Sequence, residues 1–178
     1  MSERIIDTAS YTTRTADGLR NVHTRVTAGP MSAATQLFES LGSPDDRLWP
    51  GDRWPAMELD RGMELGSCGG HGSIRYYVDA VEPGRSVTFR FDPDQGIVGT
   101  HSLTIEGLDD GRVRWTHVLE VVKPGRVLTA VLVPLHDTVL EDLLDQAEAE
   151  QAGTALVRRP LSLRVKACLT AERLTSGA

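Results

Sequence analysis

Three histidines are the residues of this sequence whose type and position best suit chemistry. His101 and His117 each share the alternation of the apolar residues in a predicted strand, and His136 lies on the apolar stripe of a predicted helix. Imidazole gives and accepts protons near neutral pH, and burial shifts its pKa further. Imidazoles directed into one interior could take a proton from a carbon between two carbonyls, protonate the attacked carbonyl and assist the loss of water. We therefore expect all three to be catalytic residues.

Two of these histidines are expected to meet in space. His101 and His117 lie on consecutive predicted strands, and Asp109-Asp110-Gly111 is a hairpin signal between them. If that turn is tight, the two side chains lie diagonally across an antiparallel pair, within reach of each other. The structural alternative is that each is a hydrogen-bonded core residue.

A metal site is a further alternative for the same residues. Three imidazoles are a known zinc set, but the sequence has no HExxH or similar ligand spacing. Cys68 and Cys168 have neither metal-ligand spacing nor a disulfide framework, so we expect two reduced thiols. We therefore expect no metal and no cofactor.

Further residues are expected to contact a bound molecule. Tyr76 and Phe89 share the alternation of their apolar neighbours, and the tyrosine would offer its hydroxyl as a polar handle. Arg61 has the same parity as nearby apolar residues and could hold a carboxylate or carbonyl oxygen, unless Gly62 marks a turn that exposes it. The expected ligand-binding set is Tyr76, Arg61, Trp54, Trp115, Phe89 and His71.

The last three members of that set differ in how well the sequence places them. Trp54 lies in a loop that could roof a cavity, although it could equally pack in a small cluster under the loop. Trp115 shares the predicted face of His117. His71 lies between glycines that allow a bulge, so its direction is open. His23 is the only histidine that we place outside the interior.

The elements that must position these residues follow one another as strand, helix, meander and helix. A strand is expected over 19–28, and a helix over the apolar positions from Ala34 to Leu41. From Met57 to Val122, apolar and polar residues alternate through about six strands with short turns, which predicts antiparallel neighbours. The longest helical pattern follows at 127–153, and Pro134 predicts a kink or a helix start inside it.

This order predicts an α+β fold. The last helix carries the only long apolar stripe available to cover the apolar face of the sheet. We expect a curved antiparallel sheet of about seven strands around a long C-terminal helix, with a mostly apolar cavity between them. The expected domain organisation is an N-terminal arm (1–18), one ligand-binding domain (19–153) and a basic C-terminal extension (154–178) with a short helix over 160–174.

Composition excludes several classes of protein. The chain has 178 residues, of which 40% are hydrophobic, as expected for one globular domain. Residues 152–178 hold five basic and one acidic side chain, so the formal charge of −6 divides into +4 there and −10 elsewhere. An acidic body argues against nucleic-acid binding. The sequence lacks a membrane-spanning run and a secretory signal, and we expect a cytoplasmic protein.

The chain resembles the START-like helix-grip superfamily (SRPBCC, including Bet v 1-like proteins), and within it the polyketide cyclase/dehydrase-like branch. The resemblance covers roughly 19–153 and rests on the order of elements, on Glu82-Pro83-Gly84-Arg85 between two strands, and on the closing helix. The stretches SPDDRLWPGDRWPAMELD, GGHGSIRYYV and PLHDTVLEDLLD are similar to actinobacterial members. The residues after 153 lie outside the usual domain.

This resemblance implies binding of a small hydrophobic or polyketide-like molecule, but the superfamily has several functions. The first hypothesis is an enzyme of the aromatase/cyclase or dehydratase kind, a biosynthetic lyase that uses the histidines for aldol-type cyclisation or dehydration. The second is a non-catalytic carrier of an apolar ligand. The third is a co-chaperone-like interaction module that uses the basic tail or the exposed sheet face. A homodimer through sheet edges or the tail is compatible with all three.

Overall fold

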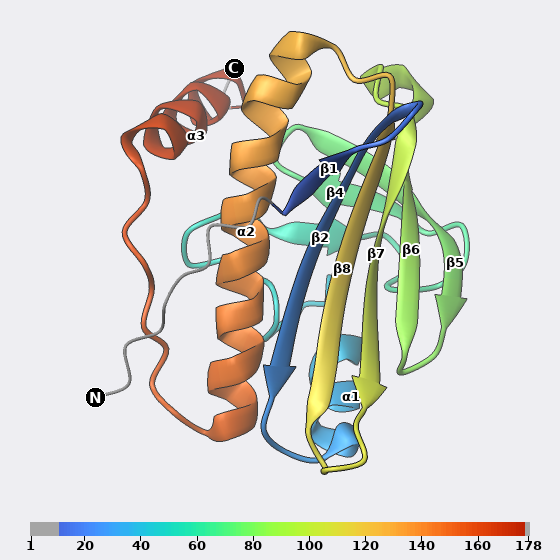
Figure 1. Cartoon of the computed structure of the whole chain (residues 1–178), viewed down its shortest axis with the longest axis vertical. Coiled ribbons are helices and arrows are strands. Elements are labelled where there is room, and N and C mark those ends of the chain that lie inside the picture. Colours follow the sequence, from blue (N-terminus) through green and yellow to red (C-terminus); the bar gives the residue numbers. More distant parts are fainter. Residues whose placement is uncertain (1–10, 177–178) are drawn as a thin grey trace.

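The computed structural model describes the backbone of residues 11–176, and the side chains of that range except those of 126–128 and 171–176. It shows an α+β fold with one open, curved, antiparallel sheet in the strand order β1-β2-β8-β7-β6-β5-β4-β3 (Figure 1). The strands are β1 (Thr12–Arg14), β2 (Gly18–Thr27), β3 (Met57–Leu59), β4 (Cys68–His71), β5 (Ile74–Glu82), β6 (Ser86–Phe91), β7 (Gly99–Gly107) and β8 (Val113–Val122).

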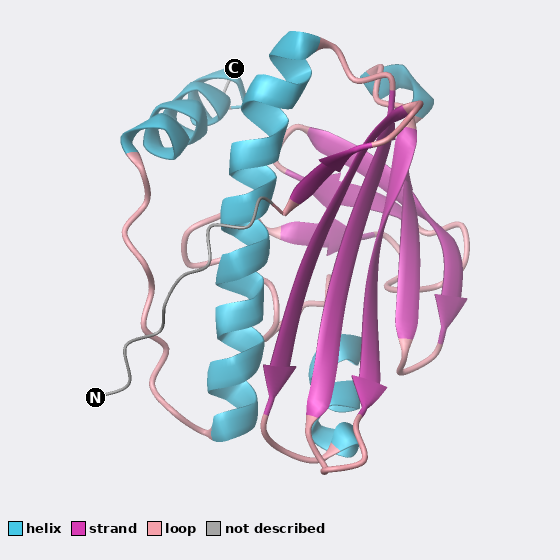
Figure 2. Ribbon diagram, in the orientation of Figure 1, coloured by secondary structure: helices cyan, strands magenta, loops and turns pink. Residues whose placement is uncertain are grey.

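Helices lie along one face of this sheet. The longest, α2 (Arg126–Ala152), runs the length of the sheet beside β2, and α1 (Met31–Glu39) packs against β7 and α2 at one end (Figure 2). A short 3₁₀ helix, η1 (Pro93–Gln95), joins β6 to β7. The C-terminal helix α3 (Leu163–Ser176) folds back beside the first half of α2.

The expected α+β class, with a curved antiparallel sheet and a long C-terminal helix, is confirmed, and the strand count differs by one. The meander supplies six strands and β2 a seventh, as predicted. The eighth is β1, which pairs with β2 through Thr12 and Asn21, inside the residues expected to form an arm. Helix α3 occupies nearly the range in which a short helix was expected.

The buried apolar side chains of the described residues form three clusters. The largest cluster of buried apolar side chains joins α1, the central strands and the second half of α2, and includes Phe38, Trp115 and Leu144. A second cluster lies at the other end of the strands around Phe91 and Leu119. A third joins α3 and the loop after α1 to α2, through contacts of Trp54, Val139, Leu140, Val165 and Leu169.

Strand β2 turns polar side chains toward the helix layer, contrary to the usual pattern. The positions of β2 that lie under α2 are polar, while Val22 and Val26 are only half-buried on the opposite side. Asn21, His23 and Thr27 are buried because α2 presents carboxylate and amide groups to them. Our placement of His23 outside the interior is therefore wrong.

Helix α2 continues through Pro134 and does not begin there. A proline has no N–H to donate, so the carbonyl of Ala130, four residues earlier, loses its helical partner. The Arg164 guanidinium of α3 donates to that carbonyl instead. The C-terminal extension therefore supplies the hydrogen bond that the proline removes.

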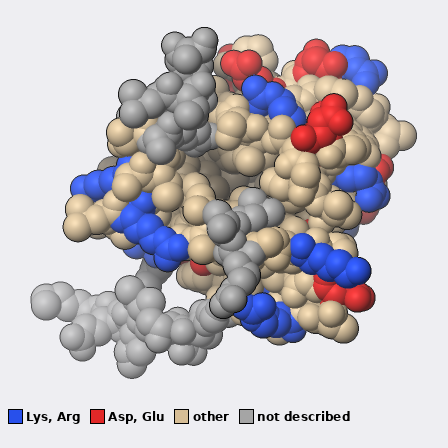
Figure 3. All heavy atoms as spheres, turned by 90° about the horizontal axis from the view of Figure 1, so that it is seen from above, with Lys and Arg blue, Asp and Glu red and all other residues tan. Residues whose placement is uncertain are grey.

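The basic extension packs against the acidic side of α2. Arg158 donates to the side chain of Asp52 and to the Asp142 carbonyl, and Arg159 donates to the carboxylates of Glu141 and Asp145. The positive tail thus contacts the acidic body of its own chain. On the face seen from above, acidic and basic side chains lie next to one another at the top and right, and a few basic side chains gather at the left edge (Figure 3). Within residues 11–176, no helix is both long and apolar enough to cross a bilayer.

Candidate functional site

A pocket of about 450 Å³ lies between the sheet and α2. Strands β3 to β8 form one wall, the first two-thirds of α2 forms the other, and the loop after α1 and Cys168 of α3 border it. Most of its lining is apolar, with residues such as Phe91, Leu119, Leu132 and Leu135. The volume is that of a typical small-molecule site.

The three histidines singled out from the sequence all line this pocket. In the register of β7 and β8, His101 pairs with Leu119 and His117 pairs with Leu103, so the two imidazoles lie on a diagonal, as predicted. Their ring centroids are 5.6 Å apart. His136 reaches the same space from α2, with its ring 5.0 Å from that of His117.

Four of the six expected ligand contacts also line the pocket: Tyr76, Phe89, His71 and Trp54. The ring of Tyr76 packs edge-on against His101 at 4.8 Å, and Phe89 stacks on His101 at 4.9 Å. The bulge-prone His71 turns inward and lies 4.8 Å from the ring of Trp49. The indole N–H of Trp54 donates to the buried carboxylate of Asp142, which fixes the indole at the edge of the pocket.

Two of the six do not line it. Strand β3 ends at Leu59, and Arg61 lies in the following turn with its side chain 53% exposed beside Asp60. The expectation that Arg61 faces the cavity is wrong, because Gly62, at φ 62°, continues a turn and not a strand. Trp115 does point inward, but it is buried in the core beyond the pocket.

Several polar atoms on the pocket wall have no hydrogen-bond partner among the described residues. They are Tyr76 Oη, His101 Nε2, His117 Nδ1 and both ring nitrogens of His136. A buried donor or acceptor without a partner costs roughly 1–3 kcal/mol. Such groups are retained where a ligand or an ordered water can bind them.

Burial keeps these imidazoles uncharged. It lowers the pKa of His101 to about 3, with a smaller contribution from His71. The pKa values of His117 and His136 lie well below the usual histidine range, first because of burial and then because of neighbouring histidines. Burial also raises the pKa of the Tyr76 hydroxyl. At neutral pH each imidazole therefore carries one N–H donor and one lone pair.

His23 extends this group and was missed from the sequence. It pairs with His117 across β2 and β8, and its ring lies 5.8 Å from that of His136. Its Nδ1 is 2.8 Å from Glu141 Oε1, and its Nε2 is 3.1 Å from Asp137 Oδ1. Burial alone would lower the pKa of His23, but these carboxylate contacts outweigh it and raise the pKa above 6.5.

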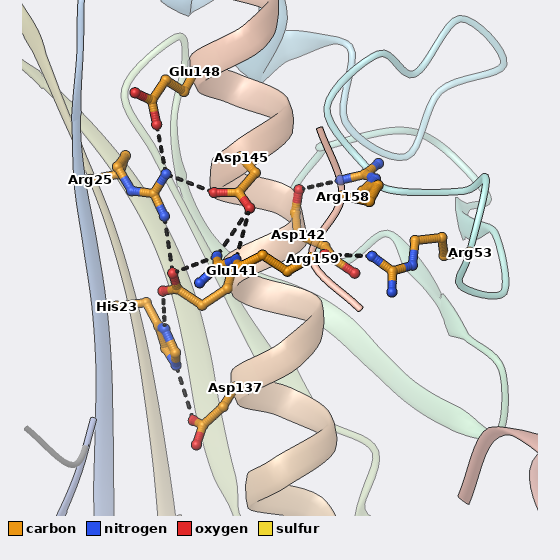
Figure 4. Close-up of polar contacts among 10 residues, drawn as sticks. All are labelled: His23, Arg25, Arg53, Asp137, Glu141, Asp142, Asp145, Glu148, Arg158 and Arg159. Atoms are coloured by element: carbon orange, nitrogen blue, oxygen red, sulfur yellow. Dashed lines mark hydrogen bonds and ion pairs between the residues drawn. The ribbon is translucent and has the colours of Figure 1, made fainter. Parts of the chain in front are cut away.

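The contacts of His23 belong to a polar seam between β2 and α2, whose central part, from His23 and Asp137 to Arg25 and Glu148, is shown in Figure 4. We define this polar seam as Asn21, His23, Arg25 and Thr27 with Asp137, Glu141, Asp145, Glu148 and Gln151. Arg25 is its centre and lies 2.7–3.0 Å from three carboxylates. The spacing of the acidic residues along α2 was visible in the sequence as the stripe opposite the apolar one. The matching polar face of β2 was not recognised.

One group of side chains in this region has the composition of a metal site. His23, His136 and Asp137 each offer one donor atom, and the three atoms lie within 4.8 Å of one another. Two imidazoles and one carboxylate are a donor set that Zn²⁺ and Fe²⁺ bind in proteins.

Comparisons with known proteins identify the fold. No family model and no curated protein matches the chain. Among solved structures, CalU16 from Micromonospora echinospora matches with a TM-score of 0.56 at 10% identity over 93% of this chain and 92% of that chain. Ms6760 from Mycobacterium smegmatis matches with a TM-score of 0.58 at 20% identity over 81% of this chain and 98% of that one.

A third match is the Aha1 dimer from Colwellia psychrerythraea, with a TM-score of 0.54 at 13% identity over 74% of this chain and 98% of that chain. The match to CalU16 covers more of the chain than the range 19–153, so the likeness reaches beyond the domain bounds expected from the sequence. At these identities, the chain shares the fold of these proteins, an antiparallel sheet with a long helix on one face.

Proposed function

We propose that this protein is a helix-grip protein of the SRPBCC superfamily that binds a small, largely apolar molecule carrying carbonyl or hydroxyl oxygens. The ligand occupies the pocket between the sheet and α2, and His101 and His117 exchange protons with it. The reaction class that fits this arrangement is aldol-type cyclisation or dehydration of a polyketide-like substrate. The CalU16-like and Aha1-like fold is compatible with both enzymes and binding proteins, so the site must carry the proposal.

The observation that carries this proposal is the set of unpaired polar atoms on an apolar wall. Tyr76, His101, His117 and His136 line a pocket whose other lining is mostly apolar, and each has at least one buried polar atom without a partner among the described residues. A purely hydrophobic ligand would leave all of them unsatisfied, whereas ligand oxygens would satisfy several at once. The ligand therefore combines an apolar frame with a few oxygens on one side.

A neutral imidazole has a lone pair that can accept a proton from carbon and an N–H that can donate a hydrogen bond. The lone pair of one ring can accept a proton from a carbon next to a carbonyl, while the N–H of its neighbour donates a hydrogen bond to the carbonyl oxygen. With 5.6 Å between their centroids, His101 and His117 can contact two adjacent atoms of one ligand. The apolar walls hold the reacting carbons close and exclude water.

The test is deuterium exchange at the carbon next to the carbonyl of 1-tetralone, followed by NMR in deuterated buffer. The wild-type protein should accelerate exchange, and His101→Phe and His117→Phe should each lower that acceleration about a hundredfold. Leu132→Met, which alters only an apolar part of the same wall, is the matched control and should exchange at the wild-type rate. Wild-type exchange rates in both histidine variants would contradict the assignment.

A non-catalytic carrier is the second candidate. It is favoured by the lowered pKa of His101, about 3. With this pKa, His101 is uncharged at neutral pH and cannot act as an imidazolium acid in the free protein. A carrier should be stabilised more by 1-naphthol than by naphthalene in thermal unfolding, because only the former offers an oxygen to the wall. Tyr76→Phe should reduce that preference. Binding of 1-naphthol without any exchange of 1-tetralone would decide for the carrier, and no stabilisation by either probe would contradict both candidates.

A further inference from the structure

Beside the pocket, where β2 meets α2, the side chains of His23, His136 and Asp137 converge (Figure 4 shows His23 and Asp137). We propose that these three residues bind one divalent transition-metal ion, for which Zn²⁺ is the simplest probe. This inference requires neither an occupant of the pocket nor any reaction there. The sequence concealed the site because one ligand comes from β2 and two come from a helix more than a hundred residues later.

His23 is already oriented as a metal ligand. Its Nδ1 lies 2.8 Å from Glu141 Oε1, so in the neutral tautomer with the proton on Nδ1 the N–H donates to that carboxylate and Nε2 offers its lone pair to a metal. A histidine that binds a metal typically donates its second ring N–H to a carboxylate in this manner. Glu141 in turn lies 3.0 Å from the Arg25 guanidinium and 3.1 Å from that of Arg159, which hold the carboxylate in place.

The contact between His23 and Asp137 is also explained by a shared cation. His23 Nε2 and Asp137 Oδ1 lie 3.1 Å apart. If Nδ1 holds the ring proton, both facing atoms carry lone pairs and repel unless a cation lies between them. Neighbouring ligand atoms on a tetrahedral zinc ion lie about 3.3 Å apart, close to the observed separation. The side-chain amide of Asn21 donates to Asp137 Oδ1 and fixes the carboxylate.

His136 supplies the third donor. Both of its ring nitrogens are buried and unpaired among the described residues. Its ring centroid is 5.8 Å from that of His23, and two imidazoles on one tetrahedral ion have centroids about 5 Å apart, so a small rotation of His136 completes the contact. His117, whose Nδ1 is also buried and unpaired among the described residues, has its ring centroid 5.0 Å from that of His136 and borders the site.

The charges around the site leave room for a divalent cation. Asp137, Glu141, Asp145 and Glu148 of the polar seam bring four carboxylates, and Arg25 and Arg159 bring two guanidinium groups. Two negative charges remain. A divalent ion bound to a neutral His23 balances them, whereas a protonated His23 balances only one. Since His136 lines the pocket, the ion would lie in the pocket wall.

The test uses the full chain, freed of metal with a chelator and titrated with Zn²⁺ in a calorimeter and with Co²⁺ in an absorption spectrometer. The wild type should bind one equivalent and show the visible bands of a low-coordinate Co²⁺ ion with nitrogen and oxygen ligands. His136→Gln and Asp137→Asn should each weaken binding about a hundredfold or more. His101→Gln, a pocket histidine outside the group, is the matched control and should bind like the wild type.

Two outcomes would overturn the inference. One is no Zn²⁺ binding by the wild type, which would leave His23 as an imidazolium in a purely structural seam. The other is equal binding by the wild type and both ligand variants, which would place the ion on other side chains. Thermal unfolding of each variant without metal checks that it folds, and the stabilisation that Zn²⁺ adds to the wild type but not to His136→Gln is an independent measure of the same site.

Discussion

Replacing His101 by phenylalanine should make the protein less sensitive to mild acid. His101 packs against Phe89 and Tyr76 in the pocket wall, and the loss of solvation there lowers the pKa of its imidazole to about 3. In the unfolded chain the same group has a pKa of about 6.5. Below that value the unfolded state binds a proton that the folded state does not accept. The free energy of unfolding therefore falls as the pH drops from 6.5 towards 3.

The size of this effect follows from the two pKa values. At about pH 5 the unfolded state gains about 2 kcal/mol from protonating one such histidine, while the folded state still gains almost nothing. Phenylalanine has a similar shape, packs with the same aromatic neighbours and does not titrate. The substitution should therefore remove about 2 kcal/mol of acid sensitivity between pH 7.5 and pH 5.

Urea unfolding followed by tryptophan fluorescence measures this quantity directly. The free energy of unfolding is determined at both pH values for the wild type and for His101→Phe, and the two pH differences are subtracted. Carboxylates and other histidines titrate in both proteins and cancel in that subtraction. Phe91→Leu, which alters another neighbour of the same ring, should keep the wild-type pH dependence. Equal pH dependence in the wild type and His101→Phe would refute the burial of this imidazole.

Three further predictions concern stability in urea at neutral pH. Arg25→Met should cost about 3 kcal/mol, because it leaves three carboxylates facing a nearly buried gap, whereas Arg114→Met, which removes an equally short but exposed ion pair, should cost less than about 1 kcal/mol. Similar costs for the two arginines would contradict the importance of the polar seam. Leu144→Ala should cost about 2–5 kcal/mol through a cavity in the main core; a loss below 1 kcal/mol would show a loosely packed core. Gln151→Met should cost about 1 kcal/mol, because the Trp115 indole N–H loses its 2.8 Å hydrogen bond to Gln151 and keeps only the longer one, 3.1 Å, to the Thr27 hydroxyl; an unchanged midpoint would show that the bond to Thr27 is enough.

Where one face of a strand is apolar, the sequence was sufficient to predict which side chains point toward the interior. In β5 to β8 the apolar residues occupy alternate positions, and the structure buries that set. The hairpin between β7 and β8 has the register that its turn signal predicts. These two local facts together place His101 diagonally from His117, so a contact across two strands could be predicted without any knowledge of the tertiary structure.

Alternation failed for β2 because its buried face is polar. His23 and Arg25 are covered only because Asp137, Glu141 and Asp145 lie opposite them, and these partners come more than a hundred residues later. A pattern of hydrophobicity within one strand contains no information about such partners. The acidic residues of α2 follow a helical spacing in the sequence, but that spacing does not show which residues lie opposite them.

The two incorrect expectations for the pocket have different causes. The alternation of residues predicted an inward Arg61 only if the strand continued beyond Leu59. The strand ends at Leu59, and a turn follows at Gly62. Trp115 does point inward, as its position in the alternating pattern predicts. That pattern gives the direction of a side chain but does not show whether it lines the pocket or lies deeper in the core. The Trp115 indole N–H is bound to Gln151 in the core, so the indole lies beyond the space that the histidines share.

The pocket and the polar seam are two consequences of the same helix. An apolar contact has no preferred direction, so a helix held only by apolar contacts can settle onto a sheet until the space between them is filled. Hydrogen bonds and ion pairs hold their partners at a set length and direction. Along β2, α2 is held by contacts of this kind from Asn21 to Thr27, which fix its distance and its rotation. The strands on the far side of the sheet curve away from a helix that cannot follow them, and the apolar and histidine side chains of α2 therefore face a space that they do not fill.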